Sequence, residues 1–157
     1  MIKVLYHYQD SVAMTRSLLE WIANPAAKHC TGLDLSANCS LEVTASCALV
    51  SSALAQTIKV LRFTEIYFSA EQLAELLAMP ALVELRVWGG TSADWAGPEY
   101  VWPTLEYEHI TVLTTNSHAK HLKILELEKH NFSEGVGTEL RQALPNLKTL
   151  RVEGDSY

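Results

Sequence analysis

Apolar residues recur along this chain in a pattern that is clearest between residues 122 and 150. Leu125 and Leu127 have the spacing of a β-strand, in which alternate side chains point to the same face. Leu140 and Leu144 then lie four residues apart, as on one face of a helix. A strand, a turn and a helix within about 25 residues form a unit too small to bury its own apolar face, so we expect neighbouring copies to stack.

The same pattern can be followed along the whole chain. The decamer AMPALVELRV at 78–87 agrees with ALPNLKTLRV at 143–152 in six of ten places. Each copy has a leucine in the middle of its expected strand, which serves as a marker of the repeat. The markers are Leu5, Leu33, Leu61, Leu85, Leu125 and Leu150, at steps of 28, 28, 24, 40 and 25 residues.

These repeats resemble the leucine-rich repeat family in its helix-containing, ribonuclease-inhibitor-like form, whose pattern is L-x-x-L-x-L-x-x-N-x-L. The block TGLDLSAN ends on the expected Asn38, whereas the later copy at 122–132 carries His130 in place of that asparagine. The resemblance implies an α/β leucine-rich repeat solenoid, with a parallel sheet on its concave side and helices on its convex side. We expect residues 1–157 to form one such domain.

Helices are expected between the strands. Asp10 or Ser11 can cap a helix that runs through Trp21, and residues 39–56 are apolar and small enough to form a second helix against the sheet. Ser69 and Gln72 have the spacing of a capping box, which predicts a further helix through Met79.

The step of 40 residues between Leu85 and Leu125 is too long for one repeat. The excess coincides with residues 89–104, a stretch rich in Gly, Pro and Trp that has neither helical nor strand periodicity, and we interpret it as an insertion loop. Residues 105–119 then predict the delayed helix. The alternative is a strand through Ile110 and Val112, which the β-branched residues favour.

Composition and net charge restrict the kind of ligand that we expect the protein to bind. The formal net charge of −6 and the pI near 5.5 argue against nucleic acid and anionic membranes as ligands, because both attract basic surfaces. A basic protein partner fits better. The chain has no apolar run of signal-peptide or membrane-span type, and its cysteines form no C-x-x-C pair, so we expect a cytosolic or nuclear protein. Cys30 and Cys47 fall at apolar positions and are expected to be buried.

The residues between the core leucines are expected to line the exposed sheet surface, because side chains alternate along a strand. One position per strand gives Tyr6, Asp34, Arg62, Arg86, Glu126 and Arg151. The position two residues later gives Tyr8, Ser36, Thr64, Trp88, Glu128 and Glu153.

Trp, Tyr and Arg are enriched among the residues that dominate protein interfaces, so part of this array is a candidate protein-binding site. Trp88 could instead pack under the insertion loop, and the acidic residues could form an ordinary solvated face paired with arginines. The candidates are Arg62, Arg86, Trp88, Glu126, Glu128 and Arg151 on the strands, with Trp95, Tyr100 and Trp102 in the insertion loop.

Motifs of enzymatic chemistry are lacking in the sequence: it has no G-x-S-x-G elbow, phosphate loop, H-E-x-x-H or G-x-G-x-x-G. His118 and His121 could share a helix face as metal ligands do, but no third ligand is spaced nearby. Paired carboxylates of the glycosidase type need a cleft that a smooth sheet does not offer. We therefore expect no enzyme, no cofactor and no metal site.

The leading expectation is a protein that binds another protein, as an inhibitor or immunity-type protein. One alternative is a module that forms a homodimer through an open sheet edge at strand 147–152. Another is an adaptor of the substrate-receptor type, and a third is a hydrolase with a polar pocket.

Overall fold

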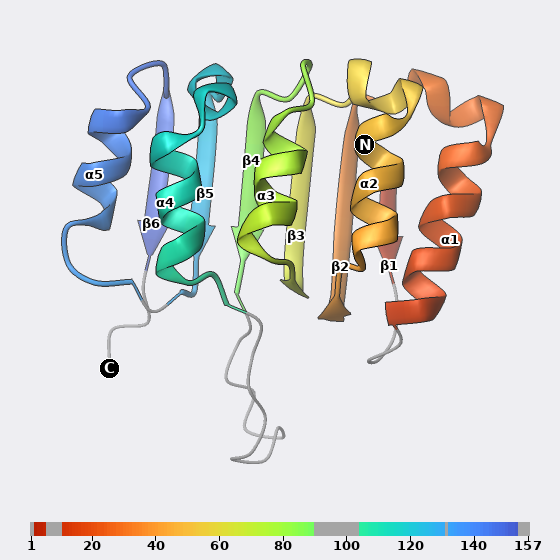
Figure 1. Ribbon diagram of the computed structural model, residues 1–157, viewed down its shortest axis with the longest axis horizontal. Helices are drawn as coiled ribbons and strands as arrows, with labels where there is room; N and C mark the ends of the chain where they lie inside the picture. The colour runs from red at the N-terminus through yellow and green to blue at the C-terminus, as the bar shows by residue number, and fades with distance from the viewer. Residues whose placement is uncertain (1, 6–10, 90–103, 131, 154–157) are drawn as a thin grey trace, which may run out of the picture.

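The computed structural model describes residues 2–5, 11–89, 104–130 and 132–153, and it has an α/β architecture (Figure 1). Within these ranges six strands form one sheet, in which every neighbouring pair is parallel and the strand order follows the chain. The strands are β1 (Ile2–Leu5), β2 (Gly32–Ser40), β3 (Val60–Tyr67), β4 (Glu84–Trp88), β5 (Ile124–Glu128) and β6 (Thr149–Glu153). The predicted parallel α/β class is confirmed.

The helices form a single layer on one side of this sheet, in the same order as the strands (Figure 1). The α-helices are α1 (Ser11–Ala23), α2 (Val43–Ser51), α3 (Ala70–Leu77), α4 (Tyr107–Thr115) and α5 (Val136–Ala143). Within the described ranges, three 3₁₀-helices precede strands: η1 (Pro25–His29), η2 (Ala53–Gln56) and η3 (Ser117–His121). The side of the sheet away from the helices, which we call the open face, has no such cover in the described ranges.

The core lies between the sheet and the helices and consists of leucines in register. Leu61 pairs with Leu33 on one side and Leu85 on the other, and Leu85 pairs in turn with Leu125. All four are at most 1% exposed, so the prediction that these marker leucines share an interior is confirmed. A second buried row, two residues later, consists of Leu35, Phe63, Val87 and Leu127.

The predicted register of the first strand is wrong. Ile2, and not Leu5, pairs with Leu33, and Lys3 stands opposite Asp34 where Tyr6 was expected. Ile2 and Val4 have the strand period of two and align with the core pair of β2. A marker that considers leucines alone does not detect Ile2 and Val4, because β-branched residues fit equally well at the core positions of a strand. Tyr6 and Tyr8 lie outside the described residues.

The predicted helices are largely confirmed. In α3 the Ser69 hydroxyl accepts a hydrogen bond from the Gln72 N–H at 3.2 Å, while the Gln72 side chain accepts one from the Ser69 N–H at 2.9 Å. Such a capping box satisfies two N–H groups that the helix leaves free. Residues 107–115 are helical, as predicted, and not a strand. The second helix begins at Val43, later than expected, because residues 39–40 still belong to β2.

Both ends of the expected insertion are tied to the turn after β5, although residues 90–103 themselves lie outside the described ranges. The His130 ring accepts a hydrogen bond from the Leu105 N–H and, with Nδ1 so occupied, its Nε2–H donates to the Val87 carbonyl, each at 3.0 Å. Gly89 donates its N–H to the Glu128 carbonyl at 2.9 Å. A Cβ at Gly89 would lie 2.1 Å from the Lys129 carbonyl oxygen, so this approach requires glycine.

Candidate functional site

The open face carries a compact group of charged side chains at the centre of the sheet. Register places Asp34, Arg62, Arg86, Glu126 and Arg151 in one row across β2 to β6. A second row consists of Thr64, Trp88 and Glu128, followed by the backbone position of Glu153. Because these residues alternate with the buried leucines, the core fixes the face on which they lie.

Three of these side chains, Arg62, Arg86 and Glu126, form one connected ion-pair network with Glu84 of β4. Glu84 accepts hydrogen bonds from both neighbouring arginines, at 2.7 Å from Arg86 Nε and 3.3 Å from Arg62 Nη2. Arg86 Nη1 also donates to Glu126 at 2.6 Å. The Glu84 and Glu126 side chains are only 13% and 10% exposed, whereas those of Arg62 and Arg86 are 33% and 27% exposed. The carboxylates therefore lie lower in the face than the two guanidinium groups.

The network stabilises the charged form of Arg86. Desolvation acts to lower the pKa of the Arg86 guanidinium, but the hydrogen bond and charge of Glu84, together with Glu126, outweigh it and raise that pKa above its ordinary value. A guanidinium held from two sides by carboxylates loses little further freedom when it binds a ligand.

A separate ion pair stands at the end of the face nearest β6. Arg151 Nη1 donates to Glu128 at 2.9 Å, and the Arg151 side chain is 56% exposed. An exposed pair of this kind contributes little to stability, about 0–1 kcal/mol.

A hollow of about 310 Å³ opens on the face beside the network. It is lined by Asp34, Arg62, Phe63, Thr64, Arg86 and Trp88. Trp88 is 43% exposed, and the Nε of Arg62 is buried without a hydrogen-bond acceptor among the described residues. The hollow thus combines the indole surface of Trp88 with the guanidinium groups of Arg62 and Arg86.

The structure brings together six of the nine predicted binding residues on the open face: Arg62, Arg86, Trp88, Glu126, Glu128 and Arg151. Trp95, Tyr100 and Trp102 lie outside the described residues. Sequence reasoning missed Glu84, which joins the two arginines. Its position two residues before Arg86 on the same strand face is the signal that could have identified it.

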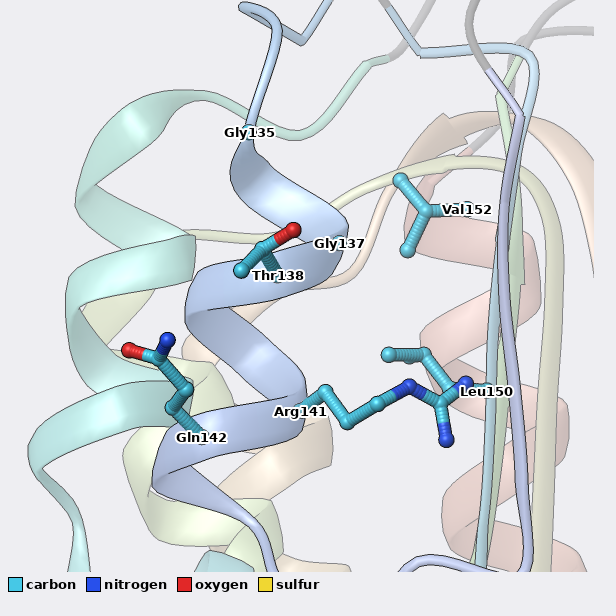
Figure 2. A pocket seen from close by; sticks show the side chains of 7 residues that line it. All are labelled: Gly135, Gly137, Thr138, Arg141, Gln142, Leu150 and Val152. Carbon is cyan, nitrogen blue, oxygen red and sulfur yellow. The ribbon is translucent and has the colours of Figure 1, made fainter.

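A second hollow, of about 640 Å³, lies beside the last described helix and strand (Figure 2). In it Arg141 extends from α5 toward Leu150 of β6, with Thr138 and Val152 nearby (Figure 2). β6 is the edge of the sheet, and Leu150 and Val152 are only partly buried there.

The prediction that both cysteines are buried holds for Cys30 and is wrong for Cys47. Cys30 is 8% exposed and its thiol donates to the Gly32 carbonyl, whereas Cys47 lies on the exposed side of α2, 3.6 Å from a Glu75 carboxylate oxygen. Alanine and leucine at neighbouring helix positions fill the core there. Local desolvation, followed by the charge of Glu75, raises the pKa of the Cys47 thiol, which disfavours a nucleophilic thiolate.

The described ranges contain no group of three or more His, Cys, Asp or Glu side chains that could hold a metal ion. His118 and His121 lie near each other in η3, with ring centroids 6.5 Å apart. None of the helices described is both long enough and apolar enough to cross a bilayer.

Comparison of the chain with protein-family models, with curated proteins and with solved structures finds no match.

Proposed function

We propose that this chain is a non-enzymatic protein-binding module of the leucine-rich repeat solenoid type, with the open face as its concave binding surface. The sequential parallel sheet, the in-register leucines and the single helix layer support this assignment of the repeat. An inhibitor or immunity-type role in the cytoplasm is part of the proposal. An adaptor of the substrate-receptor type would use the same face.

The observation that carries the proposal is the exposed Trp88 beside a preordered pair of arginines. Tryptophan and arginine are the side chains most often found at the energetic centre of protein interfaces, because they bury much surface and offer several donors. Here Arg86 is already fixed by Glu84 and Glu126 before any partner arrives. The ordering cost that usually weakens binding by long side chains is therefore small.

The ion pairs that the open-face carboxylates make favour a binding role over a catalytic one. Glu84, Glu126 and Glu128 are each ion-paired with an arginine on the open face. A general acid or base must lie within hydrogen-bond reach of the substrate proton, and these carboxylates instead accept hydrogen bonds from arginines of the same face. The overall charge of −6 favours a partner whose contact surface is basic around its edges.

Substitution of Trp88 tests this function. We expect Trp88→Ala to abolish the capture of a specific protein from a lysate of the source organism, because loss of a central tryptophan costs about 2–4 kcal/mol at a binding interface. The measurement is affinity capture with quantitative mass spectrometry, followed by a dissociation constant with the purified partner. Tyr107→Ala is the matched control, since Tyr107 is 60% exposed at the start of α4. Equal capture by wild type and Trp88→Ala would refute the proposed face.

The position of β6 at the edge of the described sheet favours a second candidate, self-association. Leu150 and Val152 are partly buried beside the second hollow, the one between α5 and β6. An exposed parallel edge can pair with another strand. In that case sedimentation of the purified chain should show a dimer that Trp88→Ala leaves intact. A monomer at micromolar concentration would dismiss this candidate.

A further inference from the structure

We propose that the open-face hollow binds an acidic side chain of the protein partner, with its carboxylate between Arg62 and Arg86. This inference rests on the proposed function and specifies which chemistry the central pocket recognises. It follows from the guanidinium N–H groups that have no acceptor within the described ranges, from the arrangement of charge and from the residues that line the rest of the hollow.

The hollow is rich in donors without acceptors. Arginine carries five N–H groups. Among the described residues, Arg62 donates from Nη2 to Glu84 in a long bond of 3.3 Å and Arg86 donates from Nε and Nη1, which leaves the Nη1 of Arg62 and the Nη2 of Arg86 without an acceptor there. The Nε of Arg62 also has no acceptor in these ranges, but it is buried below the surface of the hollow. A carboxylate oxygen is the acceptor that such guanidinium groups bind best, with two parallel hydrogen bonds.

The two arginines are held side by side in spite of their like charge. They occupy paired positions on β3 and β4, and Glu84 bonds to both. Since Glu84 and Glu126 are much less exposed than the guanidinium groups, an arriving side chain meets the cations first. The four charges of the network balance, so what it offers to an arriving carboxylate is guanidinium N–H groups that lie above the less exposed carboxylates.

The other lining residues restrict the kind of anion. The exposed indole of Trp88 provides an apolar surface for the methylene groups of a glutamate or aspartate side chain. Asp34 also lines the hollow, on β2 opposite Arg62. Its negative charge repels a dianion such as phosphate more strongly than a singly charged carboxylate, while its oxygens can accept an N–H from the backbone of the partner.

The test uses three capped pentapeptides, acetyl-Gly-Gly-Xaa-Gly-Gly-amide, in which Xaa is Glu, Gln or Lys. Each is titrated into ¹⁵N-labelled protein while the Nε–H resonances of Arg62 and Arg86 and the indole N–H of Trp88 are followed by NMR. We expect the Glu peptide to give saturable shifts at Arg62 and Trp88 and to bind at least fivefold more tightly than the Gln peptide. Inorganic phosphate, titrated separately, should bind more weakly than the Glu peptide.

Two variants test whether the preference for the Glu peptide depends on Arg62. Arg62→Gln should remove the preference for Glu, while Arg16→Gln on the exposed side of α1 removes the same charge elsewhere and should retain it. Equal affinity for the Glu and Gln peptides, tighter binding of the Lys peptide, or no saturable shift would each overturn the proposal that the hollow binds an acidic side chain. Because protein capture that depends on Trp88 is measured independently, such a failure is distinguishable from a failure of the proposed function.

Discussion

Phe63→Ala is expected to lower the free energy of unfolding by about 3–5 kcal/mol, the largest stability effect we foresee. Phe63 is fully buried in β3, in the middle of the sheet, and its ring packs on Phe68 with the centroids 4.8 Å apart. Truncation removes apolar contact and leaves a cavity that strands paired on both sides cannot close.

Thr64→Ala, one residue along the same strand, is the control for this prediction. Thr64 stands on the open face and should change the free energy of unfolding by no more than about 0.5 kcal/mol. Urea denaturation followed by circular dichroism measures both variants. Similar losses in the two would contradict the alternation of buried and open positions along β3.

Arg86→Ala should cost about 2–3 kcal/mol, less than the loss of a fully buried ion-pair partner because Arg86 is 27% exposed. The cost in stability arises from the carboxylates that lose their cation. Glu84 would keep only its long bond to Arg62, and Glu126 would lose the arginine that pairs with it in a nearly buried position. Two carboxylates at diagonal positions of neighbouring strands would then lie without the cation between them.

Arg151→Ala removes an equal charge from an exposed ion pair and should cost at most about 1 kcal/mol. Thermal and urea denaturation of the two arginine variants should therefore separate clearly. If Arg151→Ala were as destabilising as Arg86→Ala, the network around Glu84 would have no special structural role.

Much of the fold could be predicted from the spacing of leucines. A leucine followed two residues later by another apolar residue, repeated at intervals near one repeat length, indicates both the strand and the side that faces the core, as at Leu33 and Leu61. The rule failed where an apolar residue other than leucine occupies the core position of the strand. Ile2 fills the first marker position because a strand tolerates isoleucine as readily as leucine.

Helix positions were harder to orient. Cys47 was assigned to the buried side of its helix, but in a segment as uniformly small and apolar as α2 the hydrophobic pattern has little contrast between faces. The amphipathic α3 has a clear polar side and its capping box could be read from Ser69 and Gln72 alone.

The face of the candidate site was predictable, and its internal pairing was not. Alternation places Arg62, Arg86 and Trp88 together once the register is known. Which arginine pairs with which carboxylate depends on side-chain torsions and on neighbours from other strands, and those lie far apart in the sequence. Arg86 and Glu126, for example, are 40 residues apart.

The most direct test of the open face as the binding surface is the dissociation constant of the captured partner for Thr64→Arg, compared with Thr111→Arg. Thr64 lines the central hollow, and Thr111 is exposed on α4 in the helix layer. A bulky side chain at Thr64 should weaken binding at least about tenfold, or 1.4 kcal/mol, whereas the same side chain at Thr111 should change it less than about twofold. Weakened binding at Thr111 with unchanged binding at Thr64 would place the partner on the helices and contradict the account.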